Sequence, residues 1–408
     1  MKVLLLNQFY LPDTAATGQL LADVAAELVR RGHEVHVVCS RCGYGGGRKK
    51  HPAEEVLNGV HVHRLNATGF GRSRTAGRLA DYASFYTMAW RRVQAIAGLD
   101  VCMALTTPPF LATVAAGVAR RRRARLLLWM MDLYPELPAA FGVVRHGGAV
   151  HRGLSRLARS LYTRADRVIS LGPYMTQRLI LAGTPADRIV EAPPWVPAES
   201  VRPLPAEQSE ARRRWAQGAR VVMMYSGNLG LGHELETAVE AIDRLRSEDE
   251  AGGRDVRVLF VGEGKLKPKL RRMVAERGLD RVQFHPPQPL ADLNDSLAAG
   301  DFHLVAQRAG TEGLLVPAKL FGVMAAGRAT LFIGPEECEA GAILRESGAG
   351  IVVPPGDVPA AAEAIRTLCE DARLRKEMGR RAREYYERRL GLERSVSRIV
   401  AAVEGESG

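Results

Sequence analysis

Lys319 stands in an unusually apolar stretch, LLVPAKLFGVMAAGRATLFIG, which runs from Leu314 to Gly334. The stretch predicts a buried helix and then a strand, with Pro317 at the first helical position and Thr330–Ile333 as the strand. A lysine in a first helical turn is mildly unfavourable, because the helix dipole already places positive charge there. Free N–H groups together with a full charge predict a site for an anion, above all a diphosphate. A lysine that merely reaches solvent is the plain alternative.

Two turns that contain glycine are a second feature that suits a phosphate ligand. The loop LPDTAATGQLL enters a helix that starts near Gly18, and the segment SGNLGLG places Gly227 and Gly230 after an apolar run. Glycine allows a ligand to approach the backbone closely. Neither segment is a G-x-G-x-x-G fingerprint with a downstream acid for a ribose, so no dinucleotide site is predicted. A plain capping loop is the alternative at Gly18.

Polar side chains follow several of the apolar runs. Asp132 ends LLLWMMD, where it either acts in a binding site or caps the next helix, and Glu136 is a weaker candidate for the same role. Glu263 lies in the turn VGEGK and is equally well a turn residue or a hydrogen-bond acceptor for a ribose or base. Thr106 and Thr107 follow another run in the first half of the chain.

Short apolar runs alternate with amphipathic segments along the whole chain, a pattern typical of βαβ units. The predicted strands are Val3–Leu6, Val35–Cys39, Val60–Leu65, Val101–Leu105, Leu126–Met131, Val168–Leu171, Val221–Tyr225, Val256–Val261, Val282–His285, His303–Ala306, Thr330–Ile333 and Gly350–Val353. The predicted helices include Gly18–Arg31, Pro109–Arg120, Glu234–Arg246 and Lys265–Arg277. Because the runs are continuous rather than alternating, we expect strands covered on both faces, as in doubly wound parallel sheets.

A proline-rich segment, EAPPWVPAESVRPLPAEQSE, interrupts this series and predicts a linker between two α/β domains of the same type. Residues 1–192 form the first predicted domain, 193–210 the linker and 211–385 the second domain, and the final helix at 386–408 is expected to return to the first domain. Ligands bind beyond the carboxyl ends of the strands in such sheets, so two facing domains are expected to share one cleft.

The 408 residues carry a formal net charge of +12, which favours anionic partners without choosing between nucleotides, nucleic acids and phospholipids. The five cysteines are scattered, as in a reduced cytosolic protein, and the lone pair Cys39 and Cys42 is assigned no chemistry. The N-terminal apolar run is too short for a signal peptide, and no run is long enough for a membrane span. We therefore expect a cytoplasmic protein, either free or attached to the inner face of the cell membrane.

Several segments, in the order in which they occur, resemble the retaining GT-B glycosyltransferases of family 4. The likeness is greatest to the subgroup that builds colanic acid, capsule and O-antigen repeats. The segments are NQFYLPDTAATGQLLADVAAELVRRGHEVHVVCS, WMMDLYPELPAAFGV, LYTRADRVISLGPYM, MMYSGNLGLGHELETAVEAI, FVGEGKLKPKL and VPAKLFGVMAAGRATLFIG. The resemblance covers nearly the whole chain. It implies two Rossmann-like domains, with a nucleotide-diphosphate sugar bound mainly by the second and an acceptor held by the first.

The resemblance also implies roles for individual residues. Gly18 would approach the donor phosphate or sugar, Glu263 would line the nucleoside pocket, and Lys319 would meet the diphosphate. The donor-binding residues expected on this basis are Gly18, Gly227, Asn228, Gly230, Glu263, Val316, Lys319, Leu320 and Glu339. Asp132 would orient the acceptor hydroxyl or steady the reacting centre, and the acceptor-side residues are Thr106, Thr107 and Glu136.

The chain departs from the family pattern in two places. Many members carry an arginine and a lysine after the GNLG loop, whereas this chain has Leu231 and His233 there, which leaves the lysine of PAKLF as the clearest cation for the pyrophosphate. The E-x7-E signature is missing, because Gly322 stands in place of the second glutamate and Glu312 is not correctly spaced for the first. Glu339 is the predicted substitute as the ribose ligand.

The chemistry follows from the leaving group. Expelling a nucleoside diphosphate develops negative charge, which N–H groups and a lysine stabilise more in the transition state than in the ground state. No D-x-D motif follows a strand, so a metal or other cofactor is not expected beside the nucleotide sugar, which is the co-substrate. The resemblance implies same-face substitution, in which the departing phosphate helps to deprotonate the acceptor hydroxyl.

Arginines cluster in two segments of the first domain. The run RRRRAR, Arg120–Arg125, precedes a strand and is predicted to be a solvated loop at the amino ends of the sheet rather than a nucleic-acid site. The segment Arg145–Arg167 predicts an amphipathic basic helix. Its polar face carries Arg152, Arg156 and Arg159, and its apolar face carries Leu154, Leu157 and Leu161. This helix either rests on anionic lipid or packs its apolar face on the sheet.

The function predicted from the sequence is transfer of a hexose or N-acetylhexosamine from a nucleotide sugar, a UDP-sugar above all, to a glycan acceptor of surface polysaccharide. The acceptor is either free or linked to a polyprenyl lipid. The alternatives are a nucleotide-sugar epimerase or hydrolase on the same scaffold, a transferase acting on a soluble secondary metabolite, and, as the weakest, a non-catalytic nucleic-acid-binding protein. A nucleic-acid partner is not expected.

Overall fold

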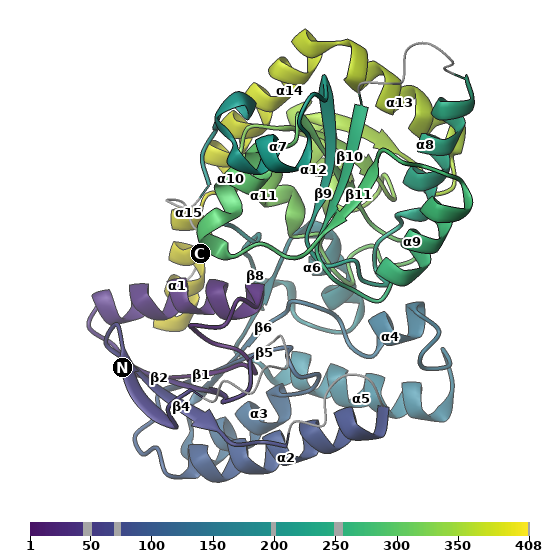
Figure 1. Ribbon diagram of the computed structural model, residues 1–408. Helices are drawn as coiled ribbons and strands as arrows, with labels where there is room; N and C mark the ends of the chain where they lie inside the picture. Colours follow the sequence, from purple (N-terminus) through teal and green to yellow (C-terminus); the bar gives the residue numbers. More distant parts are fainter. Residues whose placement is uncertain (44–50, 69–74, 197–200, 249–255, 407–408) are drawn as a thin grey trace. The chain divides into compact units, whose positions relative to one another are not determined.

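The chain folds into two compact units, seen here in a computed structural model (Figure 1). The structure describes residues 1–43, 51–68, 75–196, 201–248 and 256–406. The first unit consists of Met1–Pro193, Gly313–Leu315 and Glu393–Gly408, and the second of Pro194–Glu312 and Val316–Leu392.

The first unit is built on an eight-stranded sheet in the order β3-β4-β2-β1-β5-β6-β7-β8. Its strands are β1 (Lys2–Leu6), β2 (Glu34–Ser40), β3 (Glu54–Leu57), β4 (Val60–Leu65), β5 (Val101–Leu105), β6 (Arg125–Trp129), β7 (Arg167–Ser170) and β8 (Ile189–Glu191). All neighbours are parallel except β3 and β4. The central strands β1 and β5 are buried along almost their whole length, because helices cover both faces of the sheet.

The helices of the first unit connect these strands. They are α1 (Ala16–Arg30), α2 (Thr75–Gln94), α3 (Ala112–Arg122), α4 (Glu136–Ala140), α5 (Ala149–Arg164) and α6 (Pro173–Leu181). The prediction of a solvated loop at Arg120–Arg125 is partly wrong, since Arg120–Arg122 form the last turn of α3. Arg123 then leaves the helix with a left-handed φ of 57°, and β6 begins at Arg125, so the run does lie at an amino end of the sheet.

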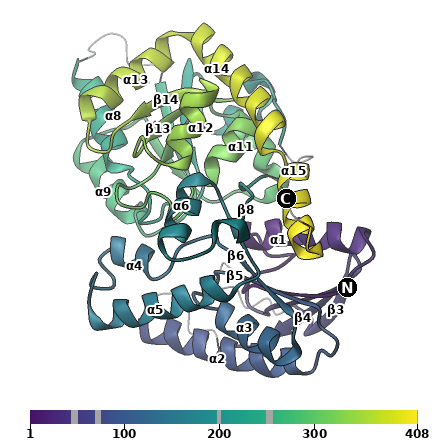
Figure 2. The same ribbon diagram turned by 180° about the vertical axis from the view of Figure 1, so that it is seen from behind.

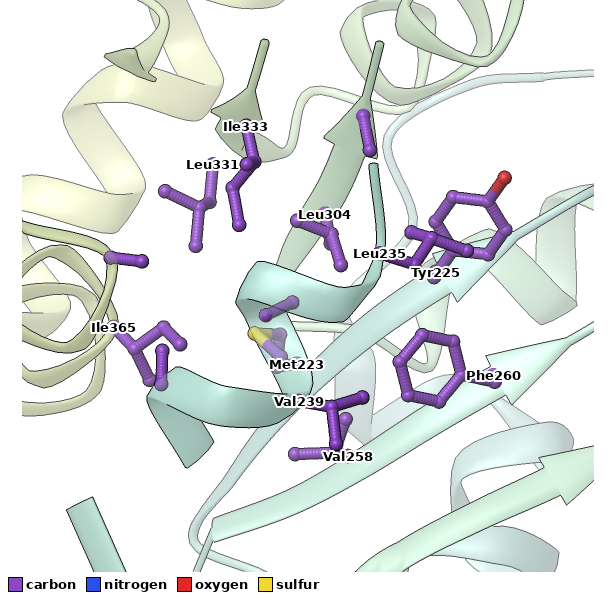
Figure 3. Close-up of a cluster of buried hydrophobic side chains, with 14 of the residues drawn as sticks. Met223, Tyr225, Leu235, Val239, Val258, Phe260, Leu304, Leu331, Ile333 and Ile365 are labelled. Atoms are coloured by element: carbon purple, nitrogen blue, oxygen red, sulfur yellow. The ribbon is translucent and has the colours of Figure 1, made fainter. Parts of the chain in front are cut away.

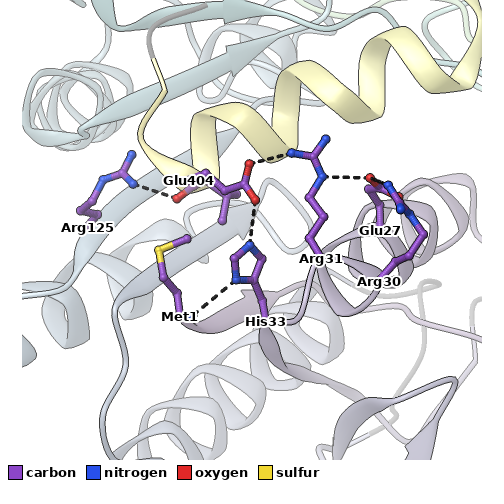
Figure 4. A network of polar contacts seen from close by, with 8 residues as sticks. Met1, Glu27, Arg30, Arg31, His33, Arg125 and Glu404 are labelled. Atoms are coloured by element: carbon purple, nitrogen blue, oxygen red, sulfur yellow. Dashed lines mark hydrogen bonds and ion pairs between the residues drawn. The ribbon is translucent and has the colours of Figure 1, made fainter.

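The C-terminal helix α15 (Leu392–Glu404) packs into the first unit and is held there by polar contacts (Figure 4). Glu404 pairs with Arg31 at 2.7 Å and with Nε2 of His33 at 2.9 Å. Arg125 donates to the Val403 and Ala402 carbonyls at 2.8 and 2.7 Å. One face of α15 is also buried, so this C-terminal helix helps to stabilise the first unit.

The second unit is built on a six-stranded parallel sheet in the order β11-β10-β9-β12-β13-β14. Its strands are β9 (Val221–Ser226), β10 (Val256–Val261), β11 (Val282–His285), β12 (Phe302–Ala306), β13 (Ala329–Ile333) and β14 (Gly350–Val353). This is the doubly wound strand order 3-2-1-4-5-6, whose order reverses between β9 and β12. The first unit has the same reversal between β1 and β5.

The core of the second unit lies on both faces of its sheet, because successive side chains of a strand point to opposite sides. Met223 and Tyr225 of β9 belong to a large apolar cluster (Figure 3), while Val222 and Met224 belong to a smaller one. Ile365, from the helix Val358–Glu370, also belongs to the large cluster. This packing explains why the strands read as continuous apolar runs.

The helices of the second unit are α7 (Glu210–Trp215), α8 (Glu236–Glu248), α9 (Lys267–Glu276), α10 (Leu293–Ala298), α11 (Lys319–Ala325), α12 (Glu339–Ser347), α13 (Val358–Glu370) and α14 (Ala372–Tyr385). α13 and α14 lie beside β13 and β14 (Figure 2), and a single π-helical turn, Tyr386–Leu390, follows α14. The chain enters this unit at Pro194, and Val201 and Ser209 of the proline-rich segment are buried in it.

The predicted fold class, two doubly wound parallel-sheet α/β domains, is confirmed. Predicted strands agree with the structure to within one or two residues; for example, the strand predicted at Leu126–Met131 is β6 at Arg125–Trp129. The edge strands β3 and β8 were not predicted, because they are short and only partly buried. Within the described residues, no helix combines the length and the hydropathy needed to span a bilayer.

Candidate active site

The second unit presents its candidate site at the point where the strand order reverses, between β9 and β12. In doubly wound sheets, ligands bind beyond the carboxyl ends of the strands at this point. The loop after β9 carries Gly227, Asn228 and Gly230, and the chain after β12 leads to Lys319 at the start of α11. Four of the predicted donor residues, Gly227, Asn228, Gly230 and Lys319, therefore lie beyond the carboxyl ends of β9 and β12.

Two glycine turns, one after β9 and one after β10, pack backbone against backbone. The Leu229 N–H donates to the Glu263 carbonyl at 2.8 Å. A Cβ on Gly262 would lie 2.0 Å from the carbonyl oxygen of Gly227, and one on Gly264 would lie 2.2 Å from that of Leu229. Both positions also have left-handed φ angles, 145° and 157°. Side chains are excluded at these positions because the two turns hold each other in place.

Lys319 lies over the first of these turns. A Cβ on Gly227 would lie 2.6 Å from Cε of Lys319, so the glycine makes room for the lysine stem. The amino group donates to Nε2 of His233 at 3.0 Å and sits 5.1 Å from the centre of the Tyr225 ring. Nδ1 of His233 lies 2.8 Å from the Ala306 carbonyl, at the end of β12.

The electrostatics of Lys319 are those of a cation without a counter-ion. Among the described residues, no carboxylate forms an ion pair with it. Burial lowers the pKa of Lys319 to about 7, because the charged form loses hydration. Burial, together with the charge on Lys319, lowers the pKa of His233 to about 3, so this imidazole is neutral. An anion placed here would meet a lysine that has no competing carboxylate.

The start of α11 differs from the prediction. The helix has 7 residues and begins at Lys319, so Pro317 precedes the helix instead of occupying its first position. The N–H groups of Leu320 and Phe321 donate to the carbonyls of Pro317 and Ala318, at 3.0 and 3.3 Å. Val316 and Leu320 are buried. Since these amides are occupied, the positive charge at this end comes mainly from the Lys319 side chain.

The loop after β9 still offers unpaired backbone donors. Among the described residues, nothing accepts a hydrogen bond from the N–H of Asn228 or Gly230. The Tyr225 hydroxyl donates to the Asn228 carbonyl at 2.7 Å and fixes this peptide. Asn228 is exposed, and a ligand can reach it. These donors lie in the same turn that Lys319 covers.

Glu263 has a partner that the sequence did not point to. Nζ of the buried Lys267 lies 2.5 Å from its carboxylate and 2.9 Å from the Gly262 carbonyl. The carboxylate of Glu263 nevertheless stays exposed, since 63% of its side chain faces solvent. Lys267 thus braces the second glycine turn. In KLKPKL it looks like one of several surface lysines, and only the spacing i, i+4 from Glu263 signals the pair.

The predicted ribose ligand remains a prediction. Glu339 is the first residue of α12 and is only 2% exposed. Gly322 is buried inside α11, where a Cβ would meet Val196 and Leu297 side chains at ordinary contact distances of 3.6 and 3.7 Å. Glu312 accepts a hydrogen bond from the Gly310 N–H at 2.9 Å.

In the first unit, Asp132 lines a small pocket beyond the ends of β5 and β6. The pocket encloses about 20 Å³, room for about one water. Its walls are mainly apolar and aromatic, and they include Phe110, Tyr134 and Tyr162. Phe110 has a left-handed φ of 64°, a conformation that is uncommon for a bulky residue and occurs more often near functional sites.

Burial raises the pKa of Asp132 to about 6, and a hydrogen bond from Tyr134 partly offsets this effect. The hydroxyl of Thr106 accepts from the backbone N–H groups of Met131 and Asp132, at 3.3 and 3.2 Å. The residue that precedes α4 is Pro135, and no side chain caps this helix, so Asp132 is not a helix cap. The arrangement is a buried carboxyl held at a strand end.

The remaining predicted residues of this unit have structural partners. The Thr107 carbonyl accepts from the Gln8 N–H at 2.8 Å, and Glu136 begins α4 and accepts from Ser155 at 3.4 Å. Gly18 is buried, and a Cβ there would lie 3.1 Å from the backbone of Phe9. The close approach that Gly18 permits in the structure is thus between α1 and its own preceding loop.

The cysteines and the acidic groups form no further centre in the part of the chain that the structure describes. All five cysteines, including Cys39 and Cys42, are free thiols. Within the described ranges, no three His, Cys, Asp or Glu side chains are grouped so that they could hold a metal ion.

Comparison with known proteins accounts for both units. Residues 16–195 match the glycosyl transferase 4-like domain, and residues 220–371 match the glycosyl transferases group 1. The chain belongs to the GT-B glycosyltransferases of the family 4 type. WcaI of Escherichia coli, by name a glycosyl transferase of colanic acid biosynthesis, is 26% identical over 99% of this chain and 100% of its own. The glycosyltransferase WbjE of Pseudomonas aeruginosa is 28% identical over 66% of each chain.

Solved structures show the same fold. Sucrose-phosphate synthase of Thermosynechococcus elongatus has a TM-score of 0.76 at 16% identity, over 99% of this chain and 98% of that one. HepE of Anabaena, solved with UDP and glucose, has a TM-score of 0.72 at 17% identity, over 99% of both chains. Identities this low establish the fold alone.

Proposed function

We propose that this glycosyltransferase moves a hexose or N-acetylhexosamine from a UDP-sugar to a glycan or lipid-linked acceptor of surface polysaccharide, with retention of configuration. The observation that carries the proposal is Lys319, whose amino group lies at the strand-order reversal of the second unit, next to His233 and without a carboxylate partner among the described residues. A nucleoside diphosphate supplies the charge that this site lacks.

Lys319 and the free amides of the turn after β9 suit the leaving group. As the bond between the anomeric carbon and the β-phosphate oxygen breaks, its electron pair goes to the diphosphate, and the Lys319 ammonium is placed to stabilise that charge. Because Lys319 supplies a cation, the proposed reaction requires no metal or other cofactor. The N–H groups of Asn228 and Gly230 are the proposed partners of the phosphate oxygens.

In the proposed step, the acceptor hydroxyl forms the new bond to the anomeric carbon on the face from which the diphosphate departs. The hydroxyl proton passes to an oxygen of the departing phosphate, so no protein nucleophile is needed. Asp132 is the proposed residue that orients the hydroxyl, since the Thr106 hydroxyl holds its backbone N–H just beyond the end of β6 and its carboxyl lines the pocket there. Proton NMR of the product distinguishes retention from inversion.

The names of relatives support the acceptor class, and they include both UDP and GDP as nucleotides. WcaI is named for colanic acid biosynthesis, which supports a surface polysaccharide. HepE has been solved with UDP and with UDP-glucose, which supports a UDP-sugar. Other relatives are named GDP-mannose-dependent enzymes, for example one from Mycobacterium tuberculosis that is 25% identical over 59% of this chain and 63% of its own. The nucleotide must therefore be tested directly.

The surface of α5 supports work at an anionic membrane. Arg152, Arg156 and Arg159 are all exposed. The predicted apolar face is divided, because Leu161 is buried whereas Leu157 is 39% exposed. Val150, which lies two helical turns before Leu157 on the same side of α5, is 67% exposed. Exposed apolar side chains beside arginines are what an interfacial helix presents to lipid. We infer that the enzyme meets a lipid-linked acceptor at the inner face of the cell membrane.

A panel of UDP-, GDP-, ADP- and dTDP-sugars tests the donor. The donor that binds should raise the melting temperature by roughly 5 to 10 °C at 100 times its Kd, because only the native state binds it. Lys319→Ala should lose this shift while keeping the melting temperature of the unliganded protein. If no nucleotide sugar shifts the wild type, or if Lys319→Ala keeps the full shift, the proposal is wrong.

Product analysis tests the reaction itself. With the donor found in this way, a transferase leaves the sugar intact until an acceptor is added. Release of free sugar or of an epimer without acceptor would instead identify a hydrolase or an epimerase. Transfer to a small soluble aglycone but not to polyprenyl-linked glycans would replace the proposed acceptor by a secondary metabolite.

A further inference from the structure

His233 lies beside Lys319 in the donor site, and the proposed reaction gives it no role. It stands three residues after Gly230, on the loop that follows β9, and it contacts the end of β12. It thus bridges the two strands between which the sheet order reverses. Its hydrogen-bond partners fix its tautomer.

The carbonyl of Ala306 can only accept a hydrogen bond, so Nδ1 of His233 must carry the proton in the 2.8 Å contact. A neutral imidazole then has one lone pair, on Nε2, and this atom lies 3.0 Å from Nζ of Lys319. Lys319 is the donor and His233 the acceptor in that bond. The carbonyl fixes the direction of the bond to Ala306, and the neutral state of His233 fixes the direction of the bond from Lys319.

The titratable groups that contact Lys319 are both uncharged. His233 is neutral, since burial and the nearby lysine lower its pKa to about 3. Tyr225, whose ring lies under the amino group, is also neutral, because burial raises its pKa well above the ordinary value. The elements packed on α11 carry Arg383, which donates to the Ala325 carbonyl at the far end of the helix. Lys319 is therefore oriented by dipoles and a ring, with no ion pair among the described residues.

An ammonium has three N–H donors. With one directed to His233, two remain for other acceptors, and the lysine stem is confined on its other side by Gly227, where even a Cβ would meet Cε at 2.6 Å. A long flexible side chain held at both its stem and its tip loses less entropy when a ligand binds.

We propose that His233 is a positioning residue of the donor site, whose Nε2 accepts one N–H of Lys319 and directs the other two to the diphosphate of the nucleotide sugar. This inference rests on the proposed function.

The test uses the full chain, with UDP as the probe in isothermal titration, or the nucleoside diphosphate that stabilises the wild type. His233→Leu removes the acceptor, whereas His233→Gln keeps an oxygen that can accept from Lys319 and an N–H that can donate to Ala306. His285→Leu is the matched control, because His285 is a partly buried histidine at the end of β11 whose ring contacts Gln283 and Trp215.

We expect His233→Leu to bind the diphosphate about tenfold more weakly, which is the size of effect expected for one hydrogen bond to a charged group. His233→Gln and His285→Leu should stay within about twofold of the wild type. Circular dichroism and melting without ligand check that all variants fold.

The pH dependence of binding separates positioning from a purely structural role. The pKa of Lys319 is lowered to about 7 by burial, so binding an anion should take up a proton and the affinity should fall as the pH rises above 7. A hydrogen bond to the charged lysine favours that form, and its loss in His233→Leu should move the fall in affinity to lower pH. His233→Gln should keep the wild-type profile.

Wild-type affinity and pH profile in His233→Leu would overturn the inference, and so would equal losses in the Leu and Gln variants with an unchanged profile. These outcomes differ from failure of the proposed function. In that case the wild type binds no nucleoside diphosphate, or Lys319→Ala binds it as well as the wild type does.

Discussion

Gly227 and Lys319 share a space that admits only one side chain. A Cβ on Gly227 would lie 2.6 Å from Cε of Lys319 and 3.3 Å from its Cδ and Cγ. Gly227 also has a φ of 131°, in a region that other residues rarely adopt. The glycine is therefore tied to the lysine as well as to its own turn.

Gly227→Ala should displace Lys319 and weaken donor binding. The new methyl group pushes the flexible lysine stem away from the turn, so we expect at least a tenfold loss of nucleoside-diphosphate affinity. The backbone strain should also lower the free energy of unfolding by roughly 1 to 3 kcal/mol. Titration calorimetry measures the first effect and chemical denaturation the second.

Gly230→Ala is the comparison for this prediction. Its Cβ would approach the side-chain amide of Asn228, which is exposed and free to turn away, at 2.7 Å. The affinity should therefore fall less than in Gly227→Ala. Equal affinities in the wild type and Gly227→Ala would show that the position of Lys319 does not matter for binding.

Asp132 should make the stability of the protein depend on pH. Burial raises its pKa to about 6 in the folded state, so between about pH 4 and pH 6 the folded protein binds a proton that the unfolded chain has released. The free energy of unfolding contributed by this group therefore falls as the pH rises through that range, and the full penalty is present above pH 6.

Asp132→Asn should remove this penalty. Above pH 6 the variant should be more stable than the wild type by roughly 1 to 3 kcal/mol, and the difference should shrink toward pH 4. Hydrogen-exchange mass spectrometry resolves the first unit separately. Asp187→Asn, at an exposed aspartate of the same unit, should show no such trend. A difference that does not change with pH would contradict a buried carboxyl at Asp132.

Ile399 tests whether the C-terminal helix is part of the first unit's core. Its side chain is 0% exposed on α15, the helix that also carries Glu404 and its contacts with Arg31 and His33. Ile399→Ala should lower the free energy of unfolding of this unit by about 2 to 5 kcal/mol. Ile180→Ala, at an isoleucine that is 44% exposed, should cost much less. Equal losses would mean that α15 is dispensable.

The fold was largely predictable because buried parallel strands leave a simple signal. Residues such as Val3–Leu6 and Val221–Tyr225 are apolar on both faces, and their runs mark β1 and β9 to within a residue or two. β3 (Glu54–Leu57) was not predicted because it pairs only with β4 and alternates between exposed and partly buried residues. Edge strands lack the continuous apolar pattern on which the prediction rested.

The candidate site was predictable only in part. Lys319 stood out because its neighbours are apolar, a local property. The role of His233 depends on Ala306, which lies 73 positions away in the chain, and no local pattern indicates that contact. The pocket at Asp132 likewise needs Tyr162 from α5. Pairings between distant segments arise from the strand order, which the sequence does not display.

The arginines of α5 give the last prediction. Arg152, Arg156 and Arg159 are exposed on a helix that also exposes Val150 and Leu157. A basic side chain near an anionic membrane contributes about 1 kcal/mol to binding. Replacing all three arginines by glutamine should therefore reduce the affinity for vesicles of phosphatidylglycerol and phosphatidylcholine by about 100-fold. Co-sedimentation measures this affinity.

The control for this change removes as much charge elsewhere in the same unit. Arg120, Arg121 and Arg123 are exposed at the end of α3, at an amino end of the sheet. Their replacement by glutamine should leave most vesicle binding intact, because the exposed apolar side chain beside α3, Trp90 next to Gly117, is 38% exposed, whereas Val150 beside the α5 arginines is 67% exposed. If both triple variants lose the same affinity, net charge alone attracts the protein to lipid, and α5 is not the membrane-facing surface.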